Sequence, residues 1–175
     1  MKASLTWSLW IASAILVVLL FAPASQAGRS GEDPVMVFIL AGQSNMEGHG
    51  KVEKGHDNVE GGVGSLRHLA ETPSTAWRYR GLLDPNGDWR TRSDVWIWST
   101  TDGGEKGKLT VGFGARNFFG PELGFGRVVG NHFDAPILLI KTAWGGKSLA
   151  KDFRPPSSEG ETGPYYEKMI EEVKN

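Results

Sequence analysis

The chain has 175 residues, of which 39% are hydrophobic and 22% charged, and its formal net charge is −1. This composition is that of one ordinary globular domain and excludes the disordered and fibrous classes. Lysine and arginine together number 19 and no basic run stands out, so nucleic acid is not an expected partner.

The N-terminus has the features of a secretory signal peptide: an early lysine, an apolar stretch over residues 10–21 and small residues after it. We expect a signal peptide over residues 1–27, cleaved after Ala27 or, alternatively, after Ala24. The protein would then be secreted or periplasmic, with no stable membrane association after cleavage. An uncleaved anchor is the alternative, because the apolar residues 7–22 approach the length of a membrane span. The chain has no cysteine, so a fold without disulfides is expected.

Residues 28–34 are small and polar and predict a linker, so the domain is expected to span residues 35–175. Residues 35–41 form a short apolar run, which is typical of a strand buried on both faces of a parallel sheet. Residues 47–112 are rich in Gly, Asp, Asn, Ser and Thr and predict a long irregular stretch, with short strand-like pieces such as residues 94–99. Loops of this length are usually functional or inserted.

The C-terminal half is predicted to contain a helix, a strand and a second helix. Pro121 suits the first turn of a helix whose apolar face ends near Asn131. Residues 135–141 form a second apolar run, closed by a pair of glycines, and residues 165–173 indicate another helix. Strand, helix and strand in this order predict a right-handed parallel crossover, and hence an α/β domain.

The first apolar run leads directly into a Gly-x-Ser turn, where an α/β hydrolase would carry a serine nucleophile. Gly42 permits a tight backbone, and a helix that begins near Ser44 would direct free N–H groups at a reacting carbonyl. Serine is also a common N-cap, so the tripeptide alone leaves a structural role for Ser44 open.

Three segments in order resemble the sialate O-acetylesterase and acetylxylan esterase group of SGNH hydrolases: residues 42–46 (GQSNM), 119–126 (FGPELGFG) and 141–149 (KTAWGGKSL). The resemblance implies a flavodoxin-like three-layer fold with a parallel sheet, incomplete at the C-terminus. It also implies an acyl-serine mechanism on O-acetylated carbohydrates, with neither a metal nor an organic cofactor.

The resemblance identifies Ser44 as the catalytic nucleophile and Gly146 as the glycine that lends an oxyanion-hole amide, with Gly145 nearly as good a match. Plain turn geometry is the alternative for both glycines. Gln43 and Asn45 would orient the substrate or shape the oxyanion hole, although Asn45 equally suits a helix cap. The sequence alone leaves the oligomeric state undetermined.

The catalytic base is the missing part of the pattern. The group uses an Asp-x-x-His pair near the C-terminus, and no aspartate of this chain has a histidine three residues later. Each of the histidines present is expected to be a surface or loop residue, and Glu122 at a helix entrance suits a structural role at least as well as a catalytic one. The histidines are His49, His56, His68 and His132. The group's Gln-Gly-Glu block is absent too. Both absences fit a chain that ends at Asn175 before those segments, and weak or absent esterase activity is then expected.

Several tryptophans have the chemistry to stack on sugar rings, with Trp144 nearest to the glycine pair; packing is the alternative for most of them. The others are Trp77, Trp89, Trp96 and Trp98. A second hypothesis for the function is a carbohydrate-binding relative, or an inactive fragment, without the Asp/His dyad. A third, an acyl hydrolase of lipid or peptide esters, rests on the serine chemistry alone.

Overall fold

The computed structural model describes residues 34–55 and 60–175. The expected signal peptide over residues 1–27, nearly all of the expected linker and His56 lie outside the described residues. Within these two ranges, no helix is both long and apolar enough to cross a membrane.

A four-stranded sheet in the order β1-β4-β2-β3 forms the centre of the domain. Strand β4 pairs in parallel with both β1 and β2, whereas β3 pairs antiparallel with β2. The strands are β1 (Met36–Gly42), β2 (Val95–Ser99), β3 (Glu105–Lys108) and β4 (Ile137–Ala143). The α/β class and the mostly parallel sheet predicted from the sequence are confirmed.

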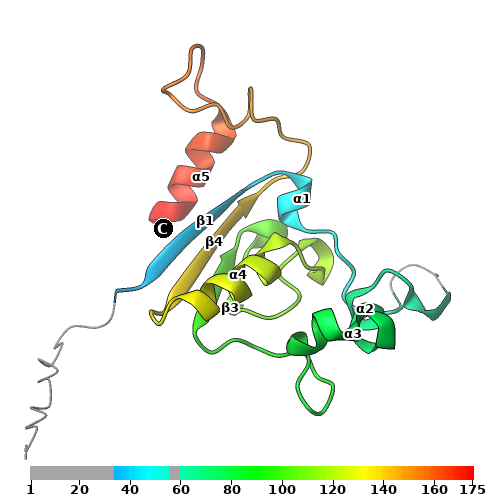
Figure 1. Cartoon of the computed structure of the whole chain (residues 1–175). Coiled ribbons are helices and arrows are strands. Elements are labelled where there is room, and N and C mark those ends of the chain that lie inside the picture. The colour runs from blue at the N-terminus through cyan, green and yellow to red at the C-terminus, as the bar shows by residue number, and fades with distance from the viewer. Residues whose placement is uncertain (1–33, 56–59) are drawn as a thin grey trace, which may run out of the picture. The chain divides into compact units, whose positions relative to one another are not determined.

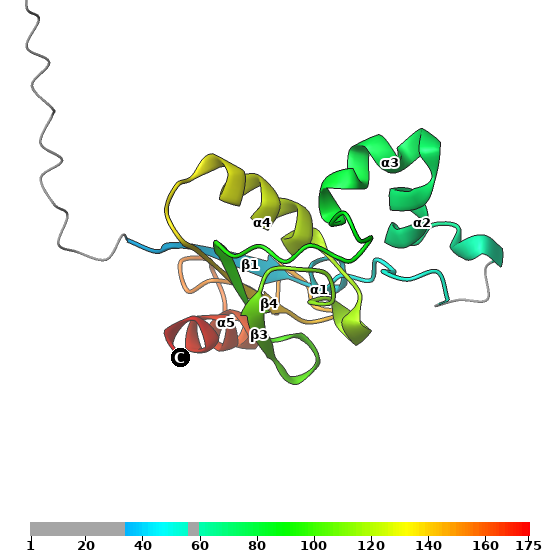
Figure 2. The ribbon, with the colours of Figure 1, turned by 90° about the horizontal axis from the view of Figure 1, so that it is seen from below.

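Two helices cover opposite faces of this sheet (Figures 1 and 2). Helix α4 (Pro121–His132) has Pro121 in its first turn, as predicted, and Leu123 and Val129 are among its buried residues. Helix α5 (Pro164–Lys174) lies on the other face. The core lies between α4 and the sheet, since Val95, Ile97, Ile137 and Leu139 are at most 1% exposed. The sheet and its two helices thus form three layers.

Strand β1 differs from the expectation of a strand buried on both faces. It occupies an edge of the sheet, and its exposure alternates along the strand. Val37 and Ile39 are about half exposed, at 51% and 47%, whereas Phe38 packs against Phe125 of α4. An uninterrupted apolar run therefore indicated a strand correctly but did not show that only one of its faces is covered.

The stretch over residues 47–112 is less irregular than expected, because it contains two short helices besides β2 and β3. These are α2 (Leu66–Glu71) and α3 (Pro73–Tyr79). The Ser65 hydroxyl caps α2 by accepting a hydrogen bond from the His68 N–H at 3.1 Å. Each helix has only about two turns, which is too short for an apolar periodicity to stand out.

Candidate functional site

The candidate site lies where the three parallel strands end. Because β1, β4 and β2 run in the same direction, the residues that follow them meet at the carboxyl edge of the sheet. Ser44 follows β1, the Gly145-Gly146 turn follows β4, and Thr101 follows β2. Figure 1 shows helix α1 (Ser44–Glu47) at this edge, beyond the end of β1.

Ser44 begins α1, and Gln43 occupies the N-cap position. The Ser44 hydroxyl donates a hydrogen bond to Gln43 Oε1 at 2.8 Å. A Cβ on Gly42 would lie 2.8 Å from Met46 Cβ, so the tight turn does require a glycine there. Asn45 lies exposed inside α1 rather than at its cap, so the capping alternative for Asn45 is wrong.

The glycine turn contains two backbone N–H groups, of which one is already hydrogen-bonded within the protein. The Gly145 N–H donates to Glu47 Oε1 at 2.8 Å, whereas Gly146 adopts a left-handed conformation with φ +71°. Among the described residues, the N–H groups of Ser44 and Gly146 have no acceptor. Both amides can therefore donate to an oxyanion.

A buried lysine, Lys141, is hydrogen-bonded to the backbone next to the serine turn. The Lys141 Nζ donates to the backbone oxygens of Glu47 at 2.7 Å and Phe113 at 2.8 Å, and to Glu122 Oε2 at 2.7 Å. The other oxygen of Glu122 accepts from the Gly120 N–H. Burial lowers the pKa of Lys141, and the adjacent Glu122 carboxylate opposes that shift.

Glu122 therefore has a structural role, which was one of the two roles expected for a carboxylate at the start of a helix. Glu122 and Lys141 are both 0% exposed, so neither side chain has access to a substrate. Together they fasten the end of β4 and the start of α4 to the last residue of α1, which fixes the backbone around Ser44.

Sequence reasoning missed Glu47 and Lys141. Lys141 carried a usable signal, since a lysine in an apolar parallel strand must be paired if it is buried. Glu47 carried none, because its partner Gly145 lies far away in the sequence and only the folded chain brings them together.

The described histidines occupy different parts of the domain. His49 lies just after α1, and its Nε2 is 3.5 Å from Glu47 Oε2. His68 contacts the Gly61 carbonyl oxygen in the α2 region. His132 ends α4, which runs back toward the start of β4, so it lies at the opposite edge of the sheet from Ser44. His49 is thus the described histidine at the serine edge.

Trp144 lies beside the glycine pair but is engaged in packing. Its ring contacts Phe153 and Tyr165 at centroid distances of 5.9 and 5.1 Å, and the Lys168 ammonium lies over it at 4.8 Å. The other tryptophans in the described part of the chain also contact cationic side chains: Trp77 with Arg78, Trp89 with Arg67, Trp96 with Lys108 and Trp98 with Lys106.

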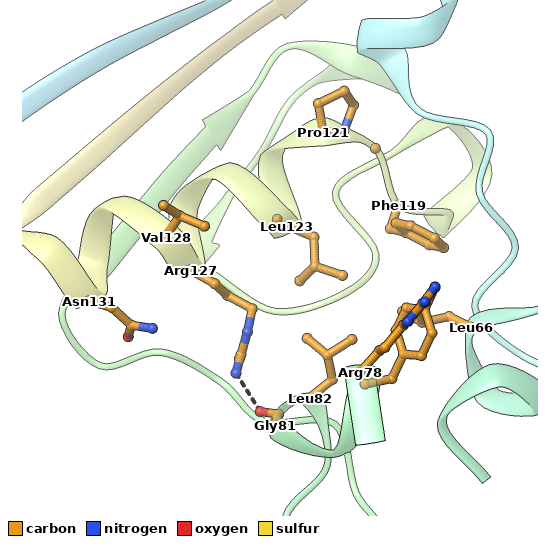
Figure 3. Close-up of a pocket in the computed structure, with 13 residues that line it drawn as sticks. Leu66, Arg78, Gly81, Leu82, Phe119, Pro121, Leu123, Arg127, Val128 and Asn131 are labelled. Atoms are coloured by element: carbon orange, nitrogen blue, oxygen red, sulfur yellow. Dashed lines mark hydrogen bonds between the residues drawn. The ribbon is translucent and has the colours of Figure 1, made fainter. Parts of the chain in front are cut away.

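A pocket of about 470 Å³ lies along α4, away from the serine turn (Figure 3). Leu82, Phe119 and Leu123 contribute apolar surface, and Arg127 crosses it to donate to the Gly81 carbonyl oxygen. Neither Ser44 nor the glycine pair lines this pocket.

The α/β fold and a serine turn at the carboxyl edge of a parallel sheet are the features of a serine-hydrolase class. Residues 34–175 match the model of the family described as carbohydrate esterase, sialic acid-specific acetylesterase. The chain belongs to this family, which confirms the resemblance found in its sequence.

Among solved structures, the chain is similar to an X-ray structure of a protein from Arabidopsis thaliana. The identity is 20% and the TM-score 0.45, over 81% of this chain and 50% of that one. The chain thus spans about half the length of that protein. No curated protein sequence matches the chain.

Proposed function

We propose that this protein is a secreted or periplasmic carbohydrate O-acetylesterase in which Ser44 is the nucleophile. The observation that carries the proposal is the pair of free N–H groups, on Ser44 and Gly146, at the carboxyl edge where the serine lies. Family membership supports an acetylated carbohydrate as the substrate.

In the proposed reaction, Ser44 Oγ attacks the acetyl carbonyl carbon and its proton passes to a base. The N–H groups of Ser44 and Gly146 stabilise the negative charge that develops on the carbonyl oxygen. The sugar oxygen leaves with a proton from the same base, which produces an acetyl-serine. Water then attacks this ester and releases acetate, which restores the Ser44 hydroxyl.

His49 is the candidate base that this part of the chain offers. It shares the serine edge, and the Glu47 carboxylate, 3.5 Å from its Nε2, would stabilise an imidazolium. The Glu47 carboxylate also accepts from Gly145, so one side chain links the candidate base to the oxyanion turn.

Acetate release from p-nitrophenyl acetate and from acetylated glycans tests the proposal, with Ser44→Ala as the variant and the exposed Ser157→Ala as the matched control. We expect Ser44→Ala to abolish turnover and Ser157→Ala to leave it unchanged. The variant His49→Gln tests whether His49 is the catalytic base. A loss of acetate release as complete as that of Ser44→Ala would identify His49 as the base. Turnover that survives in Ser44→Ala would refute the proposal.

A second candidate function is carbohydrate binding without turnover. It is favoured by the contact of Ser44 itself, whose hydroxyl donates to the Gln43 amide oxygen rather than to a histidine. A folded protein that binds sugars equally well before and after Ser44→Ala, and releases no acetate, would establish this function instead.

A further inference from the structure

The pocket along α4 has the size and the lining of a small-molecule site. Its volume of about 470 Å³ lies within the range of pockets that hold small ligands. We call it the α4 pocket. Leu82, Phe119 and Leu123 are among its apolar lining residues, and Arg127 and Asn131 are among its polar ones.

The polar residues of the α4 pocket on helix α4 lie together. Figure 3 shows Arg127 and Asn131 at one end of the pocket, with Leu82, Leu123 and Phe119 extending from there toward the other end. Arg127 and Asn131 are four positions apart on α4, so their side chains leave the same face of the helix. A ligand that lies along the pocket would therefore meet N–H donors at this end and hydrocarbon beyond it.

Arg127 is a partly buried cation that the protein does not neutralise. Its Nη2 donates to the Gly81 carbonyl oxygen, and no carboxylate forms an ion pair with it among the described residues. Burial lowers the pKa of Arg127, and the nearby Arg92 and Arg90 guanidinium groups lower it further. A partly buried charge in positive surroundings is costly, so an anion beside Arg127 would be stabilised.

Asn131 is oriented as a hydrogen-bond donor at the same end of the α4 pocket. Its Oδ1 accepts a hydrogen bond from Arg92 Nη1, which leaves the two N–H groups of the amide to donate. Figure 3 shows the amide nitrogen on the side nearer Arg127. A guanidinium and an amide N–H side by side match the two oxygens of a carboxylate.

The lining of the α4 pocket has the charge that a carboxylate requires. No aspartate or glutamate is among the described residues that line it, although the chain has a net charge of −1. Arg78, the second arginine of the lining, is exposed, and its guanidinium lies over the Trp77 ring at 4.8 Å. The pocket thus combines apolar surface with an excess of positive charge.

The α4 pocket is separate from the serine edge. Phe119 lies between them, because it lines the pocket and also exchanges two backbone hydrogen bonds with Gly50, at 2.8 and 2.9 Å. A ligand in the α4 pocket would contact this segment without reaching Ser44, so its binding does not depend on ester hydrolysis.

We propose that the α4 pocket binds a small amphipathic carboxylate of the medium-chain fatty acid type. Its carboxylate accepts hydrogen bonds from Arg127 and Asn131. Its hydrocarbon chain packs on Leu82, Leu123 and Phe119.

NMR titration of the full chain tests the proposal with three probes: octanoate, 1-octanol and acetate. Octanoate should bind saturably and move the amide signals of Leu82 and Leu123. It should bind at least about tenfold more tightly than 1-octanol, which lacks the charged acceptor, and than acetate, which lacks the hydrocarbon chain. Equal binding of octanoate and either control would overturn the proposal. Signals that move at Gly146 and not at Leu82 would place the ligand at the serine edge and overturn it too.

A series of carboxylates tests the apolar part of the α4 pocket. From butanoate to octanoate, each added CH₂ group should raise the affinity by roughly threefold to fourfold, the effect of burying one such group. An affinity that does not depend on chain length would refute the assignment of the hydrocarbon chain to Leu82, Leu123 and Phe119.

The variant Asn131→Asp tests the polar end. Aspartate keeps an oxygen for Arg92 but places a carboxylate where the ligand carboxylate is proposed to bind, so octanoate binding should weaken by at least about tenfold. The matched control is the exposed Asn175→Asp, beyond α5 on the other face of the sheet, which should leave the affinity unchanged. Equal effects of the two variants would contradict the proposal.

The variant Arg127→Gln tests the cation itself. Glutamine keeps an N–H donor for the Gly81 carbonyl oxygen but removes the charge, so the preference for octanoate over 1-octanol should disappear while 1-octanol still binds. Retained binding of 1-octanol shows that the pocket is still formed. The exposed Arg116→Gln, outside the pocket, should keep the full preference. A preference that survives in Arg127→Gln would refute the role of Arg127.

Discussion

The Lys141 Nζ lies 2.7 Å from Glu122 Oε2, and both side chains are completely buried. This ion pair joins the end of a core strand to the start of α4 beneath the serine turn. Its three acceptors leave the ammonium fully hydrogen-bonded, which is the condition under which a charge is tolerated in a protein interior.

Removal of one partner of this pair should be severe. Lys141→Met leaves the Glu122 carboxylate buried and uncompensated, so the free energy of unfolding should fall by about 3–5 kcal/mol. Urea denaturation measures the change, with the exposed Lys151→Met as a control that should be nearly neutral. The double variant Lys141→Met/Glu122→Leu should recover part of the loss, and no recovery would show that the charge imbalance is not its cause.

Two glycines with nearly the same φ separate a steric effect from backbone strain. Gly48 has φ +85° and a Cβ there would lie 2.4 Å from Gly120 Cα, whereas Gly87 has φ +88° and open space around it. Gly87→Ala should cost about 1 kcal/mol, from backbone strain alone. Gly48→Ala should cost about 3 kcal/mol or more, because the serine turn would be driven away from α4. Equal thermal shifts for the two variants would contradict this close approach.

Glu47 should control the order of the glycine turn. In Glu47→Ala the Gly145 N–H loses a charged acceptor that contributes about 1.5–3 kcal/mol, so its amide hydrogen exchange should accelerate by at least roughly tenfold. Exchange measured by NMR checks this expectation, with the exposed Glu159→Ala as the matched control. An unchanged Gly145 rate would mean that Glu47 does not hold the turn.

Glu172 should make stability depend on pH. Burial raises the pKa of Glu172, although the Thr100 side chain and the Lys168 ammonium oppose this shift. Between the ordinary glutamate pKa and the raised one, the folded protein binds more protons than the unfolded chain, so stability should fall as pH rises through this window. Glu172→Gln should stabilise the protein at pH 7 by about 0.5 kcal/mol and remove this dependence. Urea denaturation at pH 4.5 and pH 7 measures both, and a loss of stability at pH 7 would contradict it.

The elements that carry the site could be predicted because their sequence signals are local. Apolar runs located β1 and β4 to within two residues, Pro121 located the start of α4, and the Gly-x-Ser turn located Ser44. The resemblance of three sequence motifs then identified the family. Neither the composition nor the hydrophobic periodicity of the chain could have identified it.

The contacts that organise the site could not be predicted, because they join residues far apart in the chain. Glu47 contacts Gly145, and Lys141 contacts the backbone at Glu47 and Phe113, only in the folded chain. The left-handed conformation of Asp102 and Asn117 could not be predicted either, because aspartate and asparagine tolerate this conformation without requiring it.

The pairing of β1 with β4 also has a consequence for when the serine turn is assembled. Met36 pairs with Ile137, about 100 residues later in the chain. The topology of the sheet therefore requires a long stretch of chain to be present before β1 and β4 can pair. During synthesis, β4 must leave the ribosome before β1 can pair with it. Ser44 is therefore made about 90 residues before the strand whose pairing with β1 completes the site.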